Sequence, residues 1–325
     1  MTHTTTLPHY TSILQETATA TYLKTKKQLV NYTDTKTPDE LWRNHNHPTT
    51  QTTNPDHNLL TLKHTIADRL TTNCILCERR CHTNRHTTTG PCHTHDTRIA
   101  CEFLHTGEEP PLIPSHTIFF SGCPLHCVFC QNWDISQTAS GDYLNPAQLA
   151  ERITIRAKQG SKNVNWVGGD PTANLPYILD VLQNLTINIP QVWNSNMYCS
   201  RETMRLLSGV IDLYLTDIKF GNDTCAQRLA DVDNYVAVVQ RNHLLAAQDG
   251  DILVRHLLLP DHFECCTKPV LEWLAAHLPS AVINIMTQYH PEYHAASYPE
   301  LRRPISSMEQ RNAIEYAEKL GLHLL

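Results

Sequence analysis

Three cysteines stand close together in the middle of the chain, Cys123, Cys127 and Cys130, with the spacing C-x3-C-x2-C. Three thiolates on one short loop can hold three corners of an iron–sulfur cube. No fourth cysteine completes the loop, so one iron would stay open to a ligand from outside the protein. The alternative is a zinc ion completed by His126, but adjacent residues such as His126 and Cys127 reach one ion poorly. The spacing therefore favours an iron–sulfur centre.

A second group of cysteines precedes this loop. Cys74, Cys77, Cys81 and Cys92 place four thiols within nineteen positions. Four thiolates can close a structural zinc site or a fully ligated iron–sulfur cluster, and the spacing does not distinguish these metals. Lone cysteines are usually small buried hydrophobic residues. We therefore expect no chemistry from Cys199, Cys225, Cys265 and Cys266.

The elements that would position these groups begin near residue 117, where apolar runs alternate with helical periodicity. The expected strands are Thr117–Ser121, Asn163–Val167, Gln191–Asn194, Ile211–Thr216, Ile252–Leu259 and Val282–Met286. The expected helices are Pro146–Gln159, Leu175–Leu185, Arg201–Leu207, Thr224–Ala230, Val270–His277 and Met308–Leu320. Repeated strand–helix units predict an α/β fold with a parallel sheet and right-handed crossovers. An open, incomplete barrel and a doubly wound sheet both satisfy this pattern.

Polar residues gather where these strands end. They form the groups Ser121-Gly122-Cys123, Gly168-Gly169-Asp170, Asn194-Ser195-Asn196, Asp217-Ile218-Lys219 and Gln288-Tyr289-His290. Active sites of parallel α/β folds are built at the carboxyl ends of strands. We therefore expect the five groups to surround one mouth, with at most one of Asp217 and Lys219 facing it.

The first part of the chain carries no predicted chemistry. Residues 1–70 are rich in Thr, His and Asn, with expected helices at Tyr10–Val30 and Leu59–Leu70 and a linker-like stretch at 31–58 interrupted by three prolines. We divide the chain into this extension, a cysteine-rich metal-binding module at 71–112, and a core domain at 113–325.

Composition excludes several classes of protein. The 325 residues carry a formal net charge of −6, so no overall basic surface indicates nucleic acid. No apolar run approaches the roughly 18 residues of a membrane span, and the start, MTHTTTLPHY, is unlike a secretory signal. Clustered cysteines in such a chain favour metal ligation over disulfides. We expect a cytoplasmic protein without membrane contact.

The run Phe119–Gln137, which contains the three-cysteine loop with Phe129 before its last cysteine, resembles the radical S-adenosylmethionine (SAM) superfamily. It is similar above all to the branch of pyruvate formate-lyase activating enzyme. The resemblance covers roughly residues 74 to 320, and it extends through the segments 105–111, 214–220, 255–260 and 284–289. It implies a partial (β/α)6 parallel barrel of radical SAM type behind an N-terminal cysteine-rich metal module.

The resemblance also implies cofactors. Cys123, Cys127 and Cys130 would ligate a 4Fe–4S cluster, whose free iron would chelate the amino and carboxylate groups of S-adenosylmethionine. One electron from the cluster would then cleave this cofactor to methionine and a 5′-deoxyadenosyl radical, which abstracts hydrogen from the substrate. A second metal, zinc or an iron–sulfur cluster, would occupy Cys74, Cys77, Cys81 and Cys92.

Further residues match the cofactor-binding positions of the family. Phe129 would lie near the cluster and the adenine, and the glycine-rich segment would receive the methionyl amino group, with Asp170 where the family usually carries Glu. Asp217, with Asn194 and Ser195, would help to hold a monovalent cation beside the cofactor carboxylate, and Lys219 would lie near the cofactor. The alternative for Asp217 is a helix cap or a surface turn. Arg255 stands inside an otherwise apolar strand and needs a partner if it is buried; the candidates are the cofactor carboxylate and a structural Asp or Glu. The cofactor-binding residues implied are thus Phe129, Gly168, Gly169, Asp170, Asn194, Ser195, Asp217, Lys219 and Arg255.

The resemblance also bears on the substrate. The resemblance implies a protein or peptide substrate, as when an activating enzyme installs a glycyl radical, and an electron donor such as flavodoxin or ferredoxin. One alternative keeps the radical chemistry but acts on a small molecule or RNA, with the cysteine-rich module used for substrate binding or electron delivery. The other alternative is a non-catalytic adaptor that is stabilised by its metals.

Overall fold

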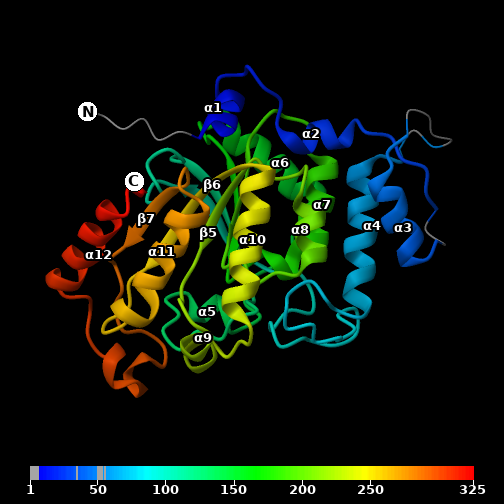
Figure 1. Ribbon diagram of the computed structural model, residues 1–325. Helices are drawn as coiled ribbons and strands as arrows, with labels where there is room; N and C mark the ends of the chain where they lie inside the picture. The colour runs from blue at the N-terminus through cyan, green and yellow to red at the C-terminus, as the bar shows by residue number, and fades with distance from the viewer. Residues whose placement is uncertain (1–6, 34–35, 50–53, 55) are drawn as a thin grey trace.

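The computed structural model describes residues 7–33, 36–49, 54 and 56–325, and an eight-stranded sheet runs through it (Figure 1). Strand β1 (Ile99–His105) pairs antiparallel with β2 (Ser115–Phe120), and every later pair is parallel. The other strands are β3 (Val164–Gly168), β4 (Gln191–Ser195), β5 (Leu213–Asp217), β6 (Asp251–Leu257), β7 (Val282–Met286) and β8 (His323–Leu324).

The strand order distinguishes the two predicted architectures. In the sheet, β1 to β8 lie in the order in which they occur in the sequence. A doubly wound sheet reverses its order at a switch point, whereas a barrel continues in one direction. The six strands β2 to β7 therefore confirm the predicted partial barrel. Sequence analysis missed β1, which lies in the segment assigned to the cysteine-rich module, and β8.

Helices follow the strands as the periodicity predicts. The predicted helices correspond to α6 (Pro146–Lys158), α7 (Leu175–Asn184), α8 (Arg201–Leu207), α9 (Asp223–Ala230), α11 (Lys268–His277) and α12 (Ser307–Lys319). Local sequence fixes several of these starts. At α6, the Asn145 side chain accepts a hydrogen bond from the helix backbone, and the Gln148 side chain accepts one from Asn145 N, which together form a capping box. The short helix α5 (Trp133–Ser136) and the long helix α10 (Tyr235–Asp249) were not predicted.

The barrel interior is apolar at one end and polar at the other. Side chains two residues apart share one face of a strand. Val192, Leu213, Leu215 and Leu253 accordingly form one buried cluster with Leu7 and Tyr10 of the N-terminal segment. The next residues on the same strand faces are Asn194, Asp217 and Arg255. The residues along these strands therefore place apolar side chains at the floor of the barrel and polar side chains at its mouth.

The N-terminal segment packs against that floor. The predicted helix Tyr10–Val30 is wrong as one element, because α1 (Pro8–Leu14) and α2 (Thr21–Lys26) are separated at Glu16, whose φ is 56°. The linker-like stretch 31–58 contains α3 (Pro38–Asn46), whereas α4 (Leu59–Thr72) forms as predicted. In Figure 1, α1 lies at the end of the barrel opposite α5 and α9.

One buried carboxylate ties this segment to the sheet. Asp212 accepts hydrogen bonds from Thr21 N at 2.8 Å, Thr21 Oγ1 at 2.6 Å and Gln191 N at 2.8 Å. His9 Nε2 lies 3.0 Å from the same carboxylate, and this hydrogen bond raises the pKa of His9. The start of α2 and the start of β4 are thus held by a single side chain.

We expect Asp212→Ala to lower the free energy of unfolding by about 2–3 kcal/mol, because it leaves buried backbone donors without an acceptor. Urea titration measures the change, and hydrogen exchange should rise most in α1 and α2. Asp96→Ala is the control, since Asp96 pairs only at the surface with His95, and a change below about 0.5 kcal/mol is expected there. Equal losses in both variants would contradict the role of Asp212.

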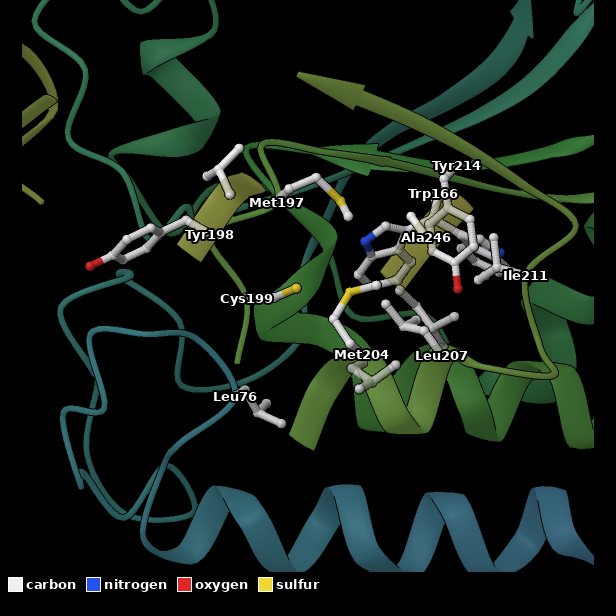
Figure 2. Close-up of a cluster of buried hydrophobic side chains, with 14 of the residues drawn as sticks. Leu76, Trp166, Met197, Tyr198, Cys199, Met204, Leu207, Ile211, Tyr214 and Ala246 are labelled. Atoms are coloured by element: carbon white, nitrogen blue, oxygen red, sulfur yellow. The ribbon is translucent and has the colours of Figure 1, made fainter. Parts of the chain in front are cut away.

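A second core lies between the sheet and its covering helices. Figure 2 shows Trp166 and Tyr214 of the sheet near Met204 and Leu207 of α8. Leu76, from the cysteine-rich segment, belongs to the same buried cluster, and its carbonyl accepts from Thr203 Oγ1 at 2.7 Å. The cysteine-rich segment is therefore packed onto the barrel. Within the described residues, no helix combines the length and the apolar character needed to span a membrane.

Candidate functional site

A cavity of about 400 Å³ opens at the carboxyl ends of the parallel strands. It is lined by all three cysteines of the C-x3-C-x2-C loop and by every residue that sequence analysis placed at the cofactor. These residues are Cys123, Cys127, Cys130, Phe129, Gly168, Gly169, Asp170, Asn194, Ser195, Asp217, Lys219 and Arg255. The predicted single mouth is therefore present, but four of its five polar groups surround it: the residues of the fifth, Gln288 to His290, do not line the cavity.

The three-cysteine loop follows β2, and polar groups from the loop and from neighbouring segments face its sulfur atoms. Leu125 N and Asn196 Nδ2 each lie 3.4 Å from Cys123 Sγ, and Ser136 Oγ lies 3.2 Å from Cys130 Sγ. Burial raises the pKa of Cys127 to about 12. Thiolates need such donors or a metal when they are buried. The loop therefore fits a 4Fe–4S cluster held by three thiolates.

The zinc alternative with His126 does not fit this geometry. His126 Nδ1 lies 3.0 Å from Asp231 Oδ2, and Nε2 lies 2.9 Å from the Pro91 carbonyl. Both ring nitrogens therefore have partners outside the three-cysteine loop. The loop backbone is held as well, because Cys123 N donates to the Cys92 carbonyl at 3.1 Å.

Two glycines, the last residue of β3 and the residue after it, allow the strand end and the cysteine loop to approach closely. Gly168 has a φ of +117°, and a Cβ there would lie 2.3 Å from Phe120 N and O. A Cβ on Gly169 would lie 2.2 Å from the Gly122 carbonyl oxygen. Any larger residue must push the cysteine loop aside. The glycine-rich segment thus has a packing reason besides its predicted contact with the cofactor.

Asp170 is buried and already engaged with protein donors. Its Oδ1 accepts from Thr172 N at 2.9 Å, and its Oδ2 accepts from Ser195 Oγ and Asn196 N, both at 2.9 Å. Burial raises the pKa of Asp170, and these bonds oppose the rise. The shorter carboxylate therefore joins β3 to the end of β4 and positions Ser195 and Asn196 at the cavity.

Charged side chains from the end of β5 and from β6 form a network that lines the cavity. Arg255 Nε donates to Asp217 Oδ1 at 2.8 Å, Lys219 Nζ donates to Asp217 Oδ2 at 2.7 Å, and Arg255 also bonds Asn194 Oδ1. Burial raises the pKa of Asp217, but Arg255 and Lys219 outweigh it and lower this pKa to about 2. Both Asp217 and Lys219 line the cavity. The expectation that at most one would face the mouth is wrong, since residues two apart share a face.

Two adjacent acids near this network were not predicted as site residues. Glu108 lines the cavity, and its Oε2 lies 3.7 Å from Arg255 Nη1. Asn165 Nδ2 donates to Glu108 at 3.2 Å, and Asn284 Nδ2 donates to Glu109 at 3.0 Å. Burial raises the pKa of Glu108, while Arg255 opposes the rise. The signal was the Gly107-Glu108-Glu109-Pro110 segment, which carried a resemblance but no assigned role.

The raised pKa of Glu108 predicts a dependence of stability on pH. Folding favours its protonated form, so this contribution is complete below the ordinary glutamate pKa of about 4.3 and is lost as pH rises through the raised value. Glu108→Gln should therefore flatten the fall in thermal midpoint above that pH. Glu102→Gln is a control with the opposite sign. Arg156 and His116 outweigh burial and lower the pKa of Glu102, so the contribution of Glu102 to stability is lost as pH falls, not as it rises. Parallel profiles for wild type and Glu108→Gln would contradict the assignment.

The second group of cysteines is also brought together. A Cβ on Gly90 would lie 3.7 Å from Sγ of both Cys81 and Cys92. Burial and then the Cys92 thiol raise the pKa of Cys77 to about 12, and burial also raises the pKa of Cys74, with Cys81 and Cys92 adding to it. The four thiols therefore share one neighbourhood. The metal that they bind stays a prediction.

Comparisons with known proteins identify the family model and the relatives that this chain resembles. Residues 117–274 match the family model described as the radical SAM superfamily. An uncharacterized protein of Methanocaldococcus jannaschii is 48% identical over 275 residues, which is 82% of this chain and 81% of that protein. A solved domain of pyruvate-formate lyase-activating enzyme from Bacteroides vulgatus is 21% identical, covering 51% of this chain and 98% of that one with a TM-score of 0.39. A spore photoproduct lyase with bound AdoMet is 9% identical, covering 70% and 78%, with a TM-score of 0.49.

Proposed function

This chain belongs to the radical SAM superfamily, and from that premise we propose that it activates a glycyl radical enzyme by taking hydrogen from a glycine in a loop of that protein. The family implies a 4Fe–4S cluster and S-adenosylmethionine. Together they supply, when bound, a 5′-deoxyadenosyl radical that abstracts hydrogen from the substrate. The observation that carries the radical chemistry is the gathering of three cysteines and the strand-end polar residues around one cavity.

The side chains of this cavity have separable tasks in the proposal. Cys123, Cys127 and Cys130 hold the cluster. Arg255 binds the cofactor carboxylate, for which its fixed fork of donors is suited, and Asp217 with Lys219 holds that fork in place. Phe129 is buried and contacts the rings of Phe220 and Tyr289, so this wall excludes water from a reactive radical.

Exposed aromatic side chains at the rim support a polypeptide substrate. Trp133 and Tyr293 are 41% and 37% exposed, and their rings stack with centroids 5.5 Å apart. Trp133 follows Asn132, which lines the cavity. Phe103, also exposed, stacks on the cavity residue Phe119 with centroids 5.7 Å apart. Exposed aromatic groups around a polar cavity are suited to holding a peptide.

The second cysteine group supports a route for electrons. Its residue Cys92 accepts a hydrogen bond from Cys123 N, so the two cysteine groups adjoin. Within the described residues, no three of the sulfur atoms of Cys74, Cys77, Cys81 and Cys92 all lie within 4.8 Å of one another. A different group of side chains in the chain does meet that spacing. A cubane cluster spreads its ligands farther than a single ion does. We therefore propose that this group takes an iron–sulfur cluster and receives electrons from flavodoxin or ferredoxin.

All twelve cysteines lie in the described part of the chain and are free thiols. Free thiols and ligated clusters persist in a reducing compartment. This supports a cytoplasmic protein, in keeping with the soluble electron donors proposed above.

The test uses a peptide that carries the glycine loop of a glycyl radical enzyme, with both glycine α-hydrogens replaced by deuterium. Anaerobically reconstituted protein, S-adenosylmethionine and a strong reductant are added, and the mass of 5′-deoxyadenosine is measured. The proposal predicts deuterium in the product. If the 5′-deoxyadenosine is unlabelled and its yield rises instead with added metabolites or RNA, those molecules become the proposed substrates. If protein with a full complement of iron gives no 5′-deoxyadenosine, the non-catalytic adaptor is favoured.

A matched pair of exposed residues tests the aromatic rim. Trp133→Ala should raise KM for the peptide by about tenfold or more, because aromatic anchors carry most of the binding energy of such contacts. Met308→Ala is the control, since Met308 is 63% exposed on α12 and does not line the cavity. Equal KM values for Trp133→Ala and wild type would contradict a peptide held by this rim.

A further inference from the structure

Cysteines that sequence analysis set aside form a third ligand group. Cys225 lies in the first turn of α9, Cys265 lies in the short π-helical turn η2 (Phe263–Thr267), and His262 precedes that turn. One ligand atom from each residue lies within 4.8 Å of the other two. Within the residues that the structure describes, no other group of three or more His, Cys, Asp or Glu side chains meets this spacing.

The separation of the two thiols fits a single metal ion. Cys225 Sγ and Cys265 Sγ lie 3.9 Å apart. Two sulfur atoms bound tetrahedrally to zinc at about 2.3 Å are about 3.8 Å apart. A disulfide would bring them to about 2.05 Å, and both cysteines are free. The pair is therefore already spaced as zinc ligands are.

His262 is oriented as a metal-binding histidine. Its Nδ1 lies 2.7 Å from the Pro260 carbonyl, and because a carbonyl only accepts, the proton must be on Nδ1. The Nε2 lone pair is then available to a metal. A backbone carbonyl that fixes the tautomer in this way is the usual partner of histidine ligands. His262 is also buried, with 4% of its surface exposed, which limits its rotation.

The two segments are held together by an independent side chain. Asn222 Oδ1 accepts from Cys225 N at 2.8 Å, and its Nδ2 donates to the Cys265 carbonyl at 2.7 Å. Gly221 permits this contact, since a Cβ there would lie 2.6 Å from the Cys266 carbonyl oxygen. Asn222 therefore fixes the positions of both thiols before any ion binds.

From this geometry we propose that Cys225, His262 and Cys265 bind one zinc ion. Two thiolates and an imidazole select zinc over the hard cations magnesium and calcium, which prefer oxygen ligands. Cys265 is exposed, so the fourth position faces solvent and takes water. The ion joins the segment that follows β5, the strand that ends at Asp217, to the segment that follows β6, the strand that contains Arg255. The proposal does not depend on the substrate or on radical chemistry.

The test is zinc content together with protection of individual thiols. Protein purified from zinc-supplemented cells is assayed for zinc and iron, as wild type, Cys265→Ser and Cys101→Ser. Cys101 is exposed on β1, outside all three cysteine groups. We expect Cys265→Ser to lose one zinc per chain with iron unchanged, and Cys101→Ser to match wild type. Because the measurement is a difference, zinc at Cys74, Cys77, Cys81 and Cys92 does not disturb it.

A second readout assigns the ion to these residues in the intact protein. After chelator treatment, alkylation with iodoacetamide and peptide mass spectrometry are carried out with and without added Zn²⁺. Zinc should protect Cys225 and Cys265 at least about tenfold and leave Cys101 unchanged. Equal alkylation with and without zinc, equal zinc content in Cys265→Ser and wild type, or a Cys225–Cys265 disulfide in freshly purified protein would each overturn the proposal. If Cys265→Ser loses zinc but still forms 5′-deoxyadenosine normally, the zinc site is supported independently of the proposed function.

Discussion

Cys127→Ala is expected to reduce 5′-deoxyadenosine formation to the level of a reaction without protein, at least about 10³-fold. Two thiolates cannot hold three corners of a cube, so the variant should lose the visible absorbance of that cluster. Cys127 is almost fully buried, and the substitution removes only one sulfur atom. The measurements are anaerobic iron and sulfide content and the yield of 5′-deoxyadenosine with a strong reductant.

Cys101→Ala controls for the loss of a cysteine as such, since Cys101 lies on the exposed face of β1. It should keep the full yield. The metal at Cys74, Cys77, Cys81 and Cys92 should survive in Cys127→Ala. If both metals disappear together, the two cysteine groups form one site rather than two.

Arg255→Leu is expected to lower the free energy of unfolding by about 3–5 kcal/mol, the range observed when one partner of a buried ion pair is removed. The side chain of Arg255 is only 13% exposed and contacts Asp217 at 2.8 Å, Glu108 at 3.7 Å and Glu109 at 4.0 Å. Without it, Lys219 is the remaining cation beside Asp217. Affinity for S-adenosylmethionine should fall as well, because the cofactor carboxylate loses its proposed partner.

Denaturant titration and equilibrium binding separate these two effects. Arg255→Lys keeps the charge but loses the planar fork, so it should recover most of the stability and little of the affinity. Lys268→Ala removes an exposed pair with Glu264 and should cost less than about 1 kcal/mol. A loss in Arg255→Leu as small as that of Lys268→Ala would show that the network does not stabilise the fold.

Local sequence predicted the parallel strands because their burial leaves a direct pattern. Val192, Leu213 and Leu253 stand in apolar runs, and short strands buried on both faces give such runs. Strand β1 escaped prediction because Ile99–His105 mixes apolar and polar residues at a half-exposed edge. Helix α10 escaped because Asn242 and His243 lie on its buried face. The Asn242 side chain donates to the Met197 and Cys199 carbonyls at 2.8 and 2.7 Å, and periodicity does not reveal such pairing.

The candidate site divides in the same way. The cysteines could be located from spacing alone, and the polar residues at strand ends from the rule that parallel strands end at one edge. The role of Glu108 could not be predicted, because its partners Asn165 and Arg255 are distant in sequence and meet only through the register of the sheet. The separation of α1 from α2 was likewise hidden, because the carboxylate that bonds both His9 and Thr21 is Asp212, far along the chain.

The closed floor of the barrel imposes an order on events. Leu7 and Tyr10 join Leu213 and Leu253 at that end, so small molecules reach the cavity from the strand-end mouth. A protein substrate seated on Trp133 would cover the same mouth. On the proposed function, S-adenosylmethionine would have to bind before the protein substrate docks. Methionine would then leave the cavity only after the protein substrate has departed. The enzyme would follow compulsory-order kinetics, in which excess protein substrate traps the chain in a dead-end complex without cofactor.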